Sequence, residues 1–202
     1  MKSRQDNKQR DTRIYILEQA IPLFAAQGYS GVSMRDLSKA VGISAAALYH
    51  HYPDKQSLYL GAMEYVFADK AEGIEEALGG TGTAIERLEQ FVTRFVELMG
   101  NDPNFRALLQ RELLDGDEQR LKLLAERVFI GPFQAITALA EDLVPDCDPH
   151  MLAISMAGLV LFHFDTAPIR RFLPGGQPEH NDLAVVAKHI THLLSKALGV
   201  EK

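Results

Sequence analysis

Two short helical segments separated by a single glycine constrain this 202-residue chain more than any other feature of its sequence. Ser33 is a plausible N-cap for the segment MRDLSKAV, Gly42 turns the chain, and Ser44 is a plausible N-cap for AAALYHHY, which stops before Pro53. Helices this short are marginal alone, so a preceding helix over about 12–28 is expected to pack against them. The pattern predicts a three-helix module that contains a helix-turn-helix. The core that its helices share is expected to consist of Leu37, Val41, Ile43 and Leu48.

The rest of the chain also has the periodicity of helices. Apolar residues recur three and four apart almost throughout, and no sustained alternation indicates a strand. Breaks rich in glycine and proline divide the later part into about six helices, and Gly131-Pro132 is expected to kink the one over about 118–143. We therefore expect an all-α fold of about nine helices, with the three-helix domain at 1–56 and a larger helical domain at 57–202.

Charge is distributed unevenly between these two parts. Residues 1–56 hold eight Lys or Arg and five acids, a balance of +3, whereas the remaining residues hold thirteen and twenty-two, a balance of -9. A cationic module on an anionic body fits a protein that offers one face to a polyanion. Part of the positive charge belongs to a basic N-terminal arm, which contains Lys2, Arg4, Lys8 and Arg10.

Other classes of protein find little support. The single cysteine, Cys147, can form neither an intramolecular disulfide nor a thiolate zinc cage, and the N-terminus has no apolar leader. The longest apolar run, at 151–164, is shorter than the ~20 residues that span a bilayer. We expect a soluble cytoplasmic protein that does not bind membranes.

No enzyme chemistry is indicated either. No nucleophile stands beside a base with a third group to orient it, so we expect no catalytic residues. His189 and His192 are three apart and could share a metal, but no third ligand accompanies them, so we expect no metal and no cofactor.

The helix-turn-helix carries side chains suited to DNA. The second helix of a helix-turn-helix fits the major groove of DNA, while the first helix crosses the DNA backbone. Arg35 and Lys39, four apart, can reach the backbone or a base edge, and the serine caps place free amides where a phosphate is favoured. Further donors stand at the end of the second helix and just beyond it: Tyr49, His50, His51 and Lys55.

Residues 12–60 resemble the DNA-binding domain of the TetR/AcrR family of transcriptional regulators. The resemblance rests on Gly28-Tyr29, on SMRDLSKAVGIS at 33–44 and above all on LYHHYPDKQSLY at 48–59. The later part of the chain resembles the family only in size, helicity and acidity.

The resemblance implies a role for individual residues. Tyr49 and Lys55 would bind phosphates, and Ser33, at the N-terminus of its helix, would contact another phosphate. The residues that would face base edges are Arg35, Ala45, Ala46 and His50. His51 is as often a packing residue as a DNA contact. Positions 45–47 are all alanine, where relatives commonly place a lysine or arginine, a glycine or proline, and a threonine, so direct base contacts look sparse. Recognition would then depend on DNA shape, on Arg35 and on the basic arm.

The family forms homodimers through its last two long helices, which correspond here to about 150–166 and 180–198. Ile154, Ala157, Gly158 and Leu161 lie at helical spacing in the first segment. The second segment repeats large apolar residues, although these stripes could instead face the chain's own core: Leu183, Val186, Ile190, Leu193 and Leu194. A two-fold dimer would bind a roughly palindromic operator.

A small-molecule effector, apolar or aromatic, is expected among the helices over about 57–143 and 150–166. Polar groups on apolar faces would mark its pocket, although most such charges are more often solvated or paired, and Arg111 and Glu112 follow an ordinary exposed pattern. The candidate ligand residues are Phe91, Phe95, Met99, Phe105, Arg106, Gln110, Phe129 and His163, with Arg94, Arg111 and Glu112 as further polar candidates.

These expectations favour a homodimeric repressor that binds a palindromic double-stranded DNA operator and is released by a ligand. The alternative is a ligand-independent or architectural DNA-binding protein whose helical body only dimerises.

Overall fold

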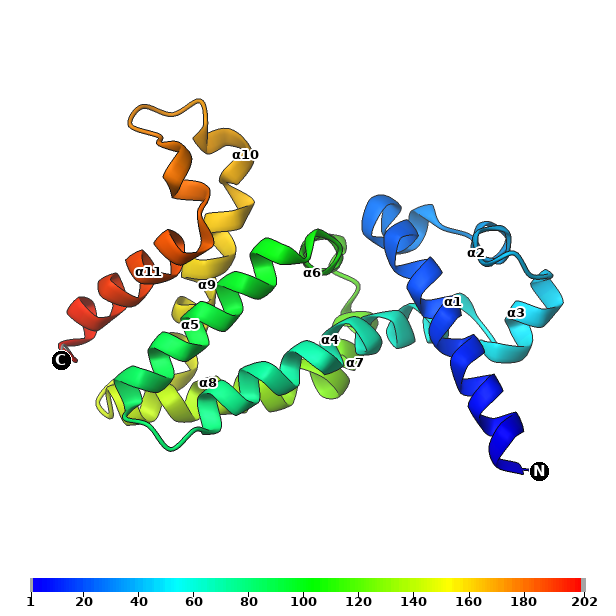
Figure 1. Ribbon diagram of the computed structural model, residues 1–202, viewed down its shortest axis with the longest axis horizontal. Helices are drawn as coiled ribbons and strands as arrows, with labels where there is room; N and C mark the ends of the chain where they lie inside the picture. The colour runs from blue at the N-terminus through cyan, green and yellow to red at the C-terminus, as the bar shows by residue number, and fades with distance from the viewer. Residues whose placement is uncertain (1, 201–202) are drawn as a thin grey trace. The chain divides into compact units, whose positions relative to one another are not determined.

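The structure, a computed structural model, describes residues 2–200 and is all-α, as the sequence predicts (Figure 1). It has eleven α-helices in the described part, two more than expected, because the stretch over 118–143 divides in two and a four-residue helix follows α9. The helices are α1 (Lys2–Gly31), α2 (Met34–Val41), α3 (Ala45–His51), α4 (Lys55–Gly79), α5 (Ala84–Asn101), α6 (Pro103–Asp115), α7 (Glu118–Leu124), α8 (Ile130–Leu143), α9 (Pro149–Asp165), α10 (Ala167–Arg170) and α11 (Leu183–Leu198).

The chain packs as two compact units. The first, called the N-terminal unit below, comprises the residues up to Asp69 together with Asn104–Val128, and the second, the C-terminal unit, comprises Lys70–Pro103 and the residues from Phe129 on. The packing boundaries therefore differ from the boundary expected after residue 56. The first part of α4, almost all of α6 and the whole of α7 pack with the helix-turn-helix.

Local signals in the sequence form the helix-turn-helix as expected. The regular helix of α1 breaks at Gly28, whose φ of 73° is one that glycine adopts without strain. Ser33 caps α2, Gly42 ends it in the left-handed conformation, and Ser44 caps α3. Because each signal acts within a few residues, the sequence was sufficient to place these boundaries.

The core of this module is largely the predicted one. Leu37, Val41 and Leu48 are buried, whereas Ile43 is only partly buried. Together with Phe24 of α1, these side chains join the three helices, and α1 packs on α2 as α2 packs on α3. Tertiary packing thus stabilises two helices that are too short to be stable on their own.

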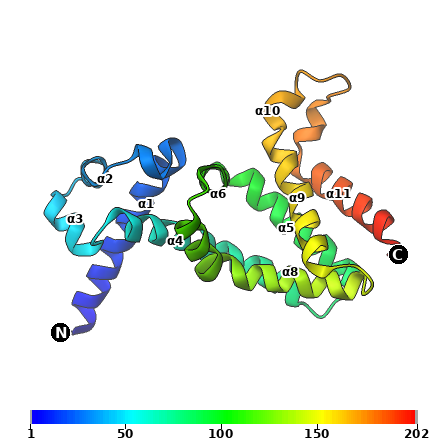
Figure 2. The ribbon, with the colours of Figure 1, turned by 180° about the vertical axis from the view of Figure 1, so that it is seen from behind.

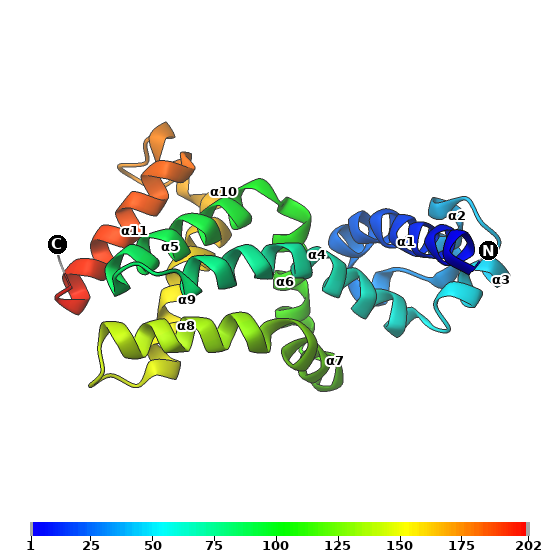
Figure 3. The same cartoon turned by 60° about the horizontal axis from the view of Figure 1, so that its bottom comes forward.

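In the C-terminal unit α5 is the central helix, and α8, α9 and α11 pack against it (Figures 2 and 3). Its contact with α11 is close at Gly100, where an added Cβ would lie 2.3 Å from a methyl carbon of Leu183. Real atoms do not approach so closely, so a side chain at position 100 would require the Leu183 side chain to move.

The helix break expected near Gly131-Pro132 lies just before that pair. The backbone is π-helical over Ala125–Phe129 and returns to α-helix at Ile130. Proline has no N–H for the carbonyl one turn earlier, which is the usual origin of such interruptions. The boundary between the two packing units, Val128 to Phe129, falls within this π-helical segment.

One helical stretch, Glu118–Leu143, is long and apolar enough to cross a membrane when judged by length and composition only. The π-helical segment interrupts it, and Arg120 near its start is buried in contact with carboxylates. Core helices of soluble proteins can pass the same test. The absence of membrane binding stays a prediction.

Candidate nucleic-acid interface

Eight of the ten predicted DNA contacts are exposed on the helix-turn-helix. They come from α2 and its cap, and from α3 and its cap, two helices that pack directly on each other. None of the eight is needed to fill the core. We refer to them as the recognition surface: Ser33, Arg35, Lys39, Ser44, Ala45, Ala46, Tyr49 and His50.

At the start of α2 the serine cap is already occupied by a carboxylate. The Ser33 hydroxyl accepts from the Asp36 amide at 3.2 Å and donates to the Asp36 carboxylate, which in turn accepts from the Ser33 amide. The Ser33 hydrogen bonds lower the pKa of Asp36, so this carboxylate stays charged. A phosphate approaching Ser33 would therefore meet a negative charge at this helix end.

Two tyrosines close in sequence lie in opposite environments. Tyr49 is 49% exposed, whereas Tyr52 is 3% exposed. The Tyr52 hydroxyl donates to the Arg13 carbonyl oxygen at 3.5 Å, and its ring lies under the Arg13 guanidinium at 4.8 Å. Tyr49 is thus free to reach DNA, and Tyr52 joins α1 to the end of α3.

Lys55 makes hydrogen bonds within the protein that the sequence did not indicate. Its ammonium donates to the carbonyl oxygens of Tyr29 at 3.0 Å and Val32 at 3.1 Å, and it lies 4.2 Å from the centre of the Tyr29 ring. It therefore ties the start of α4 to the chain between α1 and α2. An ammonium has three donors, so one remains for a phosphate.

His51 behaves as a packing residue. It is partly buried, and its Nδ1 atom is buried without a hydrogen-bond partner among the described residues. Burial lowers its pKa, and the nearby His50 and Arg13 lower it further. His51 is therefore held in its neutral form, which makes it a weak ligand for a phosphate.

A buried polar cluster in the N-terminal unit was not anticipated. Glu112 of α6, which the sequence analysis placed in an exposed pattern, is 2% exposed, so that interpretation was wrong. Its carboxylate accepts from Arg120 Nε at 3.0 Å and from the Tyr59 hydroxyl at 2.7 Å. Arg120, also buried, pairs in addition with Asp115 and with Asp117. We call these five residues the Glu112 cluster.

A signal for Glu112 was present in the sequence. Phe105, Leu108 and Glu112 are spaced three and four apart, which places them on one helix face, and all three are buried. The apolar face of α6 thus pointed to a buried carboxylate. Its partners could not be found in the same way, because Tyr59 is 53 residues away.

The Glu112 cluster touches the helix-turn-helix through Tyr29. Its ring lies 4.2 Å from the Arg120 guanidinium and 5.2 Å from the Tyr59 ring, and it also contacts Lys55. Beside it, Arg111 of α6 donates to the carbonyl oxygens of Ala25 and Ala26 at 2.7 and 2.6 Å. Two arginines therefore attach α6 and α7 to the end of α1.

Known proteins are similar to this chain, above all in its N-terminal part. Residues 16–62 match the family model described as bacterial regulatory proteins, tetR family. The nucleoid occlusion factor SlmA of Marinomonas sp. (strain MWYL1) is 28% identical over 123 residues, covering 61% of this chain and 62% of that protein. The transcriptional repressor AcnR of Corynebacterium diphtheriae is 35% identical over 98 residues, covering 45% and 52%. Over residues 16–62 this chain is therefore similar to the DNA-binding domain of the TetR family, and these comparisons support a regulator of that type.

The likeness extends through the whole fold. The crystal structure of AibR with isovaleryl coenzyme A and operator DNA matches with a TM-score of 0.67 at 21% identity, over 90% of this chain and 97% of that one. At this identity the match concerns the fold alone. The aligned segments span at most about two thirds of these two curated relatives, 62% and 52%, so the TetR-family match is most specific in the DNA-binding domain.

The ligand residues expected from the TetR-family resemblance do not form one site within either packing unit. Phe91 and Met99 of α5 are fully buried, and Phe105 packs against Phe67 with 4.1 Å between the ring centres. Phe105, Arg106 and Gln110 belong to the N-terminal unit, and the other five candidates belong to the C-terminal unit: Phe91, Phe95, Met99, Phe129 and His163. At least three of the aromatic and apolar candidates are thus core residues.

His163 is engaged within the chain. Its Nε2 atom lies within hydrogen-bond distance of the Arg170 guanidinium and 3.4 Å from the His180 carbonyl oxygen. Burial lowers its pKa and the Arg170 charge lowers it further. In its neutral form His163 accepts from Arg170 and so anchors α10 to α9.

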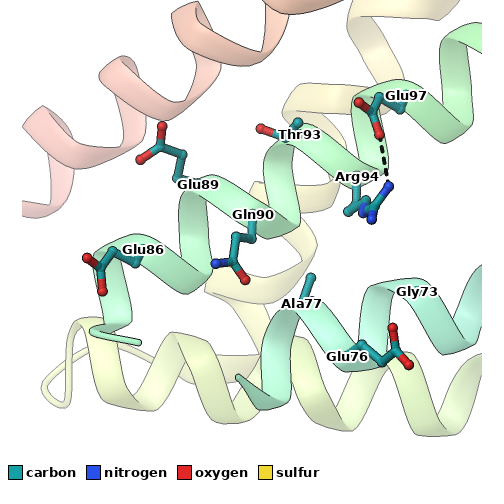
Figure 4. Close-up of a pocket in the computed structure, with 9 residues that line it drawn as sticks. All are labelled: Gly73, Glu76, Ala77, Glu86, Glu89, Gln90, Thr93, Arg94 and Glu97. Carbon is teal, nitrogen blue, oxygen red and sulfur yellow. Dashed lines mark hydrogen bonds and ion pairs between the residues drawn. The ribbon is translucent and has the colours of Figure 1, made fainter. Parts of the chain in front are cut away.

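A groove of about 540 Å³ lies between the last part of α4 and α5, and it differs from the expected apolar site (Figure 4). Four glutamates and one arginine line it, with Arg94 paired to Glu97 at 3.4 Å. Of the predicted ligand residues only Arg94 is among its lining, and that lining is acidic rather than aromatic. The glutamates are Glu76, Glu86, Glu89 and Glu97.

The two helices expected to dimerise, α9 and α11, each expose part of their apolar surface. On α11, however, Val186, Ile190 and Leu194 are buried against the chain's own core. The apolar residues predicted on this helix therefore divide into two groups. Most of them pack in the chain's own core, whereas Leu193 is exposed and available to a second copy. The exposed large apolar side chains of the two helices are Met151, Ile154, Leu159, Phe162, Val185 and Leu193.

Proposed function

We propose that this protein is a DNA-binding transcriptional regulator, acting as a repressor whose helix-turn-helix reads double-stranded DNA. The observation that carries the proposal is the recognition surface, on which eight side chains of the predicted DNA contact set are exposed on two adjacent helices. Exposed arginine, lysine and tyrosine on such a motif supply phosphate and base contacts. The +3 balance of residues 1–56 supports the same partner.

We further propose that the protein acts as a homodimer through α9 and α11. The exposed Ile154 and Phe162 on α9 and Leu193 on α11 are large apolar groups that a second copy would cover. Closed two-fold symmetry repeats the recognition helix, so the operator would be roughly palindromic.

Release by a small molecule completes the proposal. A ligand can lower DNA affinity only by the difference between its affinities for the binding and non-binding conformers. AibR, whose structure holds isovaleryl coenzyme A as well as operator DNA, is a precedent on the same fold. For this chain the acidic groove and the buried aromatic residues weaken the case for an aromatic site, so the effector is proposed only as a small molecule.

The alternative is an architectural DNA-binding protein, which needs no ligand and organises DNA instead of regulating a promoter. The likeness to SlmA, described as a nucleoid occlusion factor, favours keeping it. The three alanines at 45–47 also favour it, because alanine methyl groups can contact only thymine methyl groups in the major groove.

In vitro selection of bound DNA from a random pool at physiological salt tests the proposal. An enriched palindrome would support a dimeric, sequence-specific regulator and supply its operator. Weak enrichment without a pattern would favour the architectural alternative, and no retention of DNA at low salt would reject DNA binding altogether.

Arg35→Ala, measured on the selected operator and on its single-base variants, then sharpens the mechanism. If Arg35 reaches a base, the variant loses about 1–3 kcal/mol of discrimination at one position. Uniform weakening across all sequences would assign Arg35 to the phosphate backbone instead.

The ligand step has its own test. Compounds that release the operator should raise the melting temperature of the free protein, because they bind its folded form. A panel that raises the melting temperature without changing operator affinity would contradict release by ligand.

A further inference from the structure

The N-terminal unit contains a hollow of its own, whose lining shares only Arg10 with the residues expected to contact DNA. It has a volume of about 700 Å³ and lies between the early part of α1, the start of α4 and the π-helical segment. Arg10 and Arg13 come from α1, Glu64 from α4, and Arg127 from the π-helical segment. We call it the arginine groove.

Its charge is the opposite of the chain's. Three guanidinium groups and one carboxylate line it, a balance of +2 in a chain whose net charge is -6. Arg127 pairs with Glu64 at 3.2 Å, and both side chains are about half exposed. Arg10 and Arg13 are exposed and have no carboxylate partner among the described residues. The groove thus holds more positive charge than its own acid can neutralise.

The floor of the groove is tightly packed. An added Cβ at Gly61 would lie 3.3 Å from the Tyr52 ring and 3.4 Å from Leu17, so glycine lets α4 approach α1 closely here. The Tyr52 ring in turn supports the Arg13 guanidinium at 4.8 Å. A cation already placed on an aromatic ring loses less conformational entropy when it binds an anion.

The third guanidinium stands on an irregular backbone. Arg127 is the middle residue of the π-helical segment Ala125–Phe129. Such segments insert an extra residue into an α-helix, re-aim the side chains around them and occur often at functional sites. In this chain the irregularity carries the arginine that closes the groove.

We propose that the arginine groove binds a phosphate group. Guanidinium groups present paired donors that match phosphate oxygens, and several of them suit a multiply charged anion better than one carboxylate does. Glu64 then competes with the phosphate for Arg127, and the Arg127–Glu64 ion pair breaks when the phosphate binds. The phosphate comes either from the DNA backbone beside the site read by α3 or from a soluble phosphorylated molecule.

The soluble source is tested with inorganic pyrophosphate and the full chain, by titration calorimetry at low ionic strength. Loss of a charge-assisted hydrogen bond should weaken binding about tenfold in Arg13→Gln and in Arg127→Gln. Glu64→Gln should tighten it, because the competing carboxylate is gone. Lys122→Gln is the control, since Lys122 is also exposed and paired with one carboxylate but does not line the groove, and it should leave binding unchanged.

The DNA source is tested by the salt dependence of binding to a random-sequence duplex. Arg10→Gln and Arg13→Gln should each lower the slope of log affinity against log salt by about one unit, because each arginine would displace counterions from one phosphate. Thermal unfolding of each variant establishes that it is folded. This arm rests on the proposed function, whereas the pyrophosphate arm does not.

The outcomes separate clearly. Pyrophosphate binding that is lost in Arg127→Gln supports a soluble ligand, and a reduced slope in the α1 variants supports DNA phosphates. If pyrophosphate does not bind and the slopes are unchanged, the groove is not a phosphate site. Wild-type protein that binds no duplex at all would reject the proposed function and leave the pyrophosphate result to decide the groove.

Discussion

The recognition surface and the Glu112 cluster lie in the same packing unit, yet they use polar side chains in opposite ways. On the recognition surface Arg35, Lys39 and Tyr49 are exposed to solvent. In the cluster Glu112 accepts from both Tyr59 and Arg120, and these three residues are almost completely buried. A group that must bind a partner stays accessible, whereas a buried charge is tolerated only when it is paired and hydrogen-bonded.

The difference teaches where sequence changes should act. Changes on the recognition surface should alter binding and spare the fold. Changes in the cluster should alter the fold, because a charge left alone inside the protein is expensive. Lys55 lies between the two regions and should show both effects.

The largest effect is expected for Glu112→Ala. The substitution removes the carboxylate that pairs with Arg120 at 3.0 Å and leaves the Tyr59 hydroxyl without its acceptor. Breaking a buried pair in this way costs about 3 kcal/mol in the free energy of unfolding, which urea denaturation would measure. Asp115 and Asp117 still face Arg120, so we expect the lower end of the usual range.

Glu97→Ala is the control for that experiment. Glu97 also pairs with an arginine, Arg94, but both side chains are about half exposed or more. Exposed pairs contribute little, so the loss should stay below about 1 kcal/mol. Equal losses in the two variants would remove the distinction between the cluster and an ordinary surface pair.

Lys55→Met should come next in size. The variant keeps most of the side-chain stem and loses the two hydrogen bonds to the carbonyl oxygens of Tyr29 and Val32. We expect a loss of about 2 kcal/mol in the free energy of unfolding. If the third donor reaches a phosphate, the salt slope of DNA binding also falls by about one unit. A lower slope with unchanged stability would show that the two hydrogen bonds contribute nothing.

The local half of this comparison was predictable from the sequence. Ser33, Gly42 and Ser44 mark helix ends through contacts within a few residues, and the structure places each where the pattern predicts. The apolar spacing likewise identified Leu37 and Leu48 as core residues. Such signals need no knowledge of what packs against them.

The non-local half was not predictable. The segment around Glu112 is rich in charge and resembles a solvated helix face, and its burial depends on Tyr59 and Arg120, which come from other helices. Lys55 was predicted to bind phosphate because its side chain carries an ammonium group. Its position, however, is set by hydrogen bonds to carbonyl groups more than twenty residues earlier. Aromatic residues such as Phe91 and Phe105 were candidate ligand contacts because sequence cannot distinguish a pocket wall from a core.

Tyr49→Phe should give a smaller effect, confined to DNA. The ring remains and only the exposed hydroxyl is lost, so the free energy of unfolding should change by less than about 0.5 kcal/mol. Loss of one phosphate hydrogen bond should weaken binding to all sequences by about 1 kcal/mol, or roughly fivefold. Tyr52→Phe is the matched variant, because the Tyr52 hydroxyl is bonded to the Arg13 carbonyl oxygen inside the unit. Should both variants affect only stability, Tyr49 would not belong to the recognition surface.

The smallest effect is expected from pH, where His50 and His51 compare the two environments side by side. Their rings are 5.6 Å apart, yet His50 is exposed and His51 is partly buried. Burial, with help from His50 and Arg13, lowers the pKa of His51 below its ordinary 6.5. The folded protein therefore binds a proton at His51 less readily than the unfolded chain does.

That sign sets the direction of the pH effect. The stability contributed by neutral His51 is fully present above pH 6.5 and is lost as the pH falls through the lowered pKa of the folded state. His51→Phe should flatten this part of the pH profile of urea unfolding, while His50→Phe should leave it in place. His163 on α9, whose pKa is also lowered, titrates in the same direction, so the measurement is made in a His163→Gln background. An unchanged profile in His51→Phe would mean that His51 is as well solvated as its exposed neighbour, and His51 would then again be a candidate phosphate ligand.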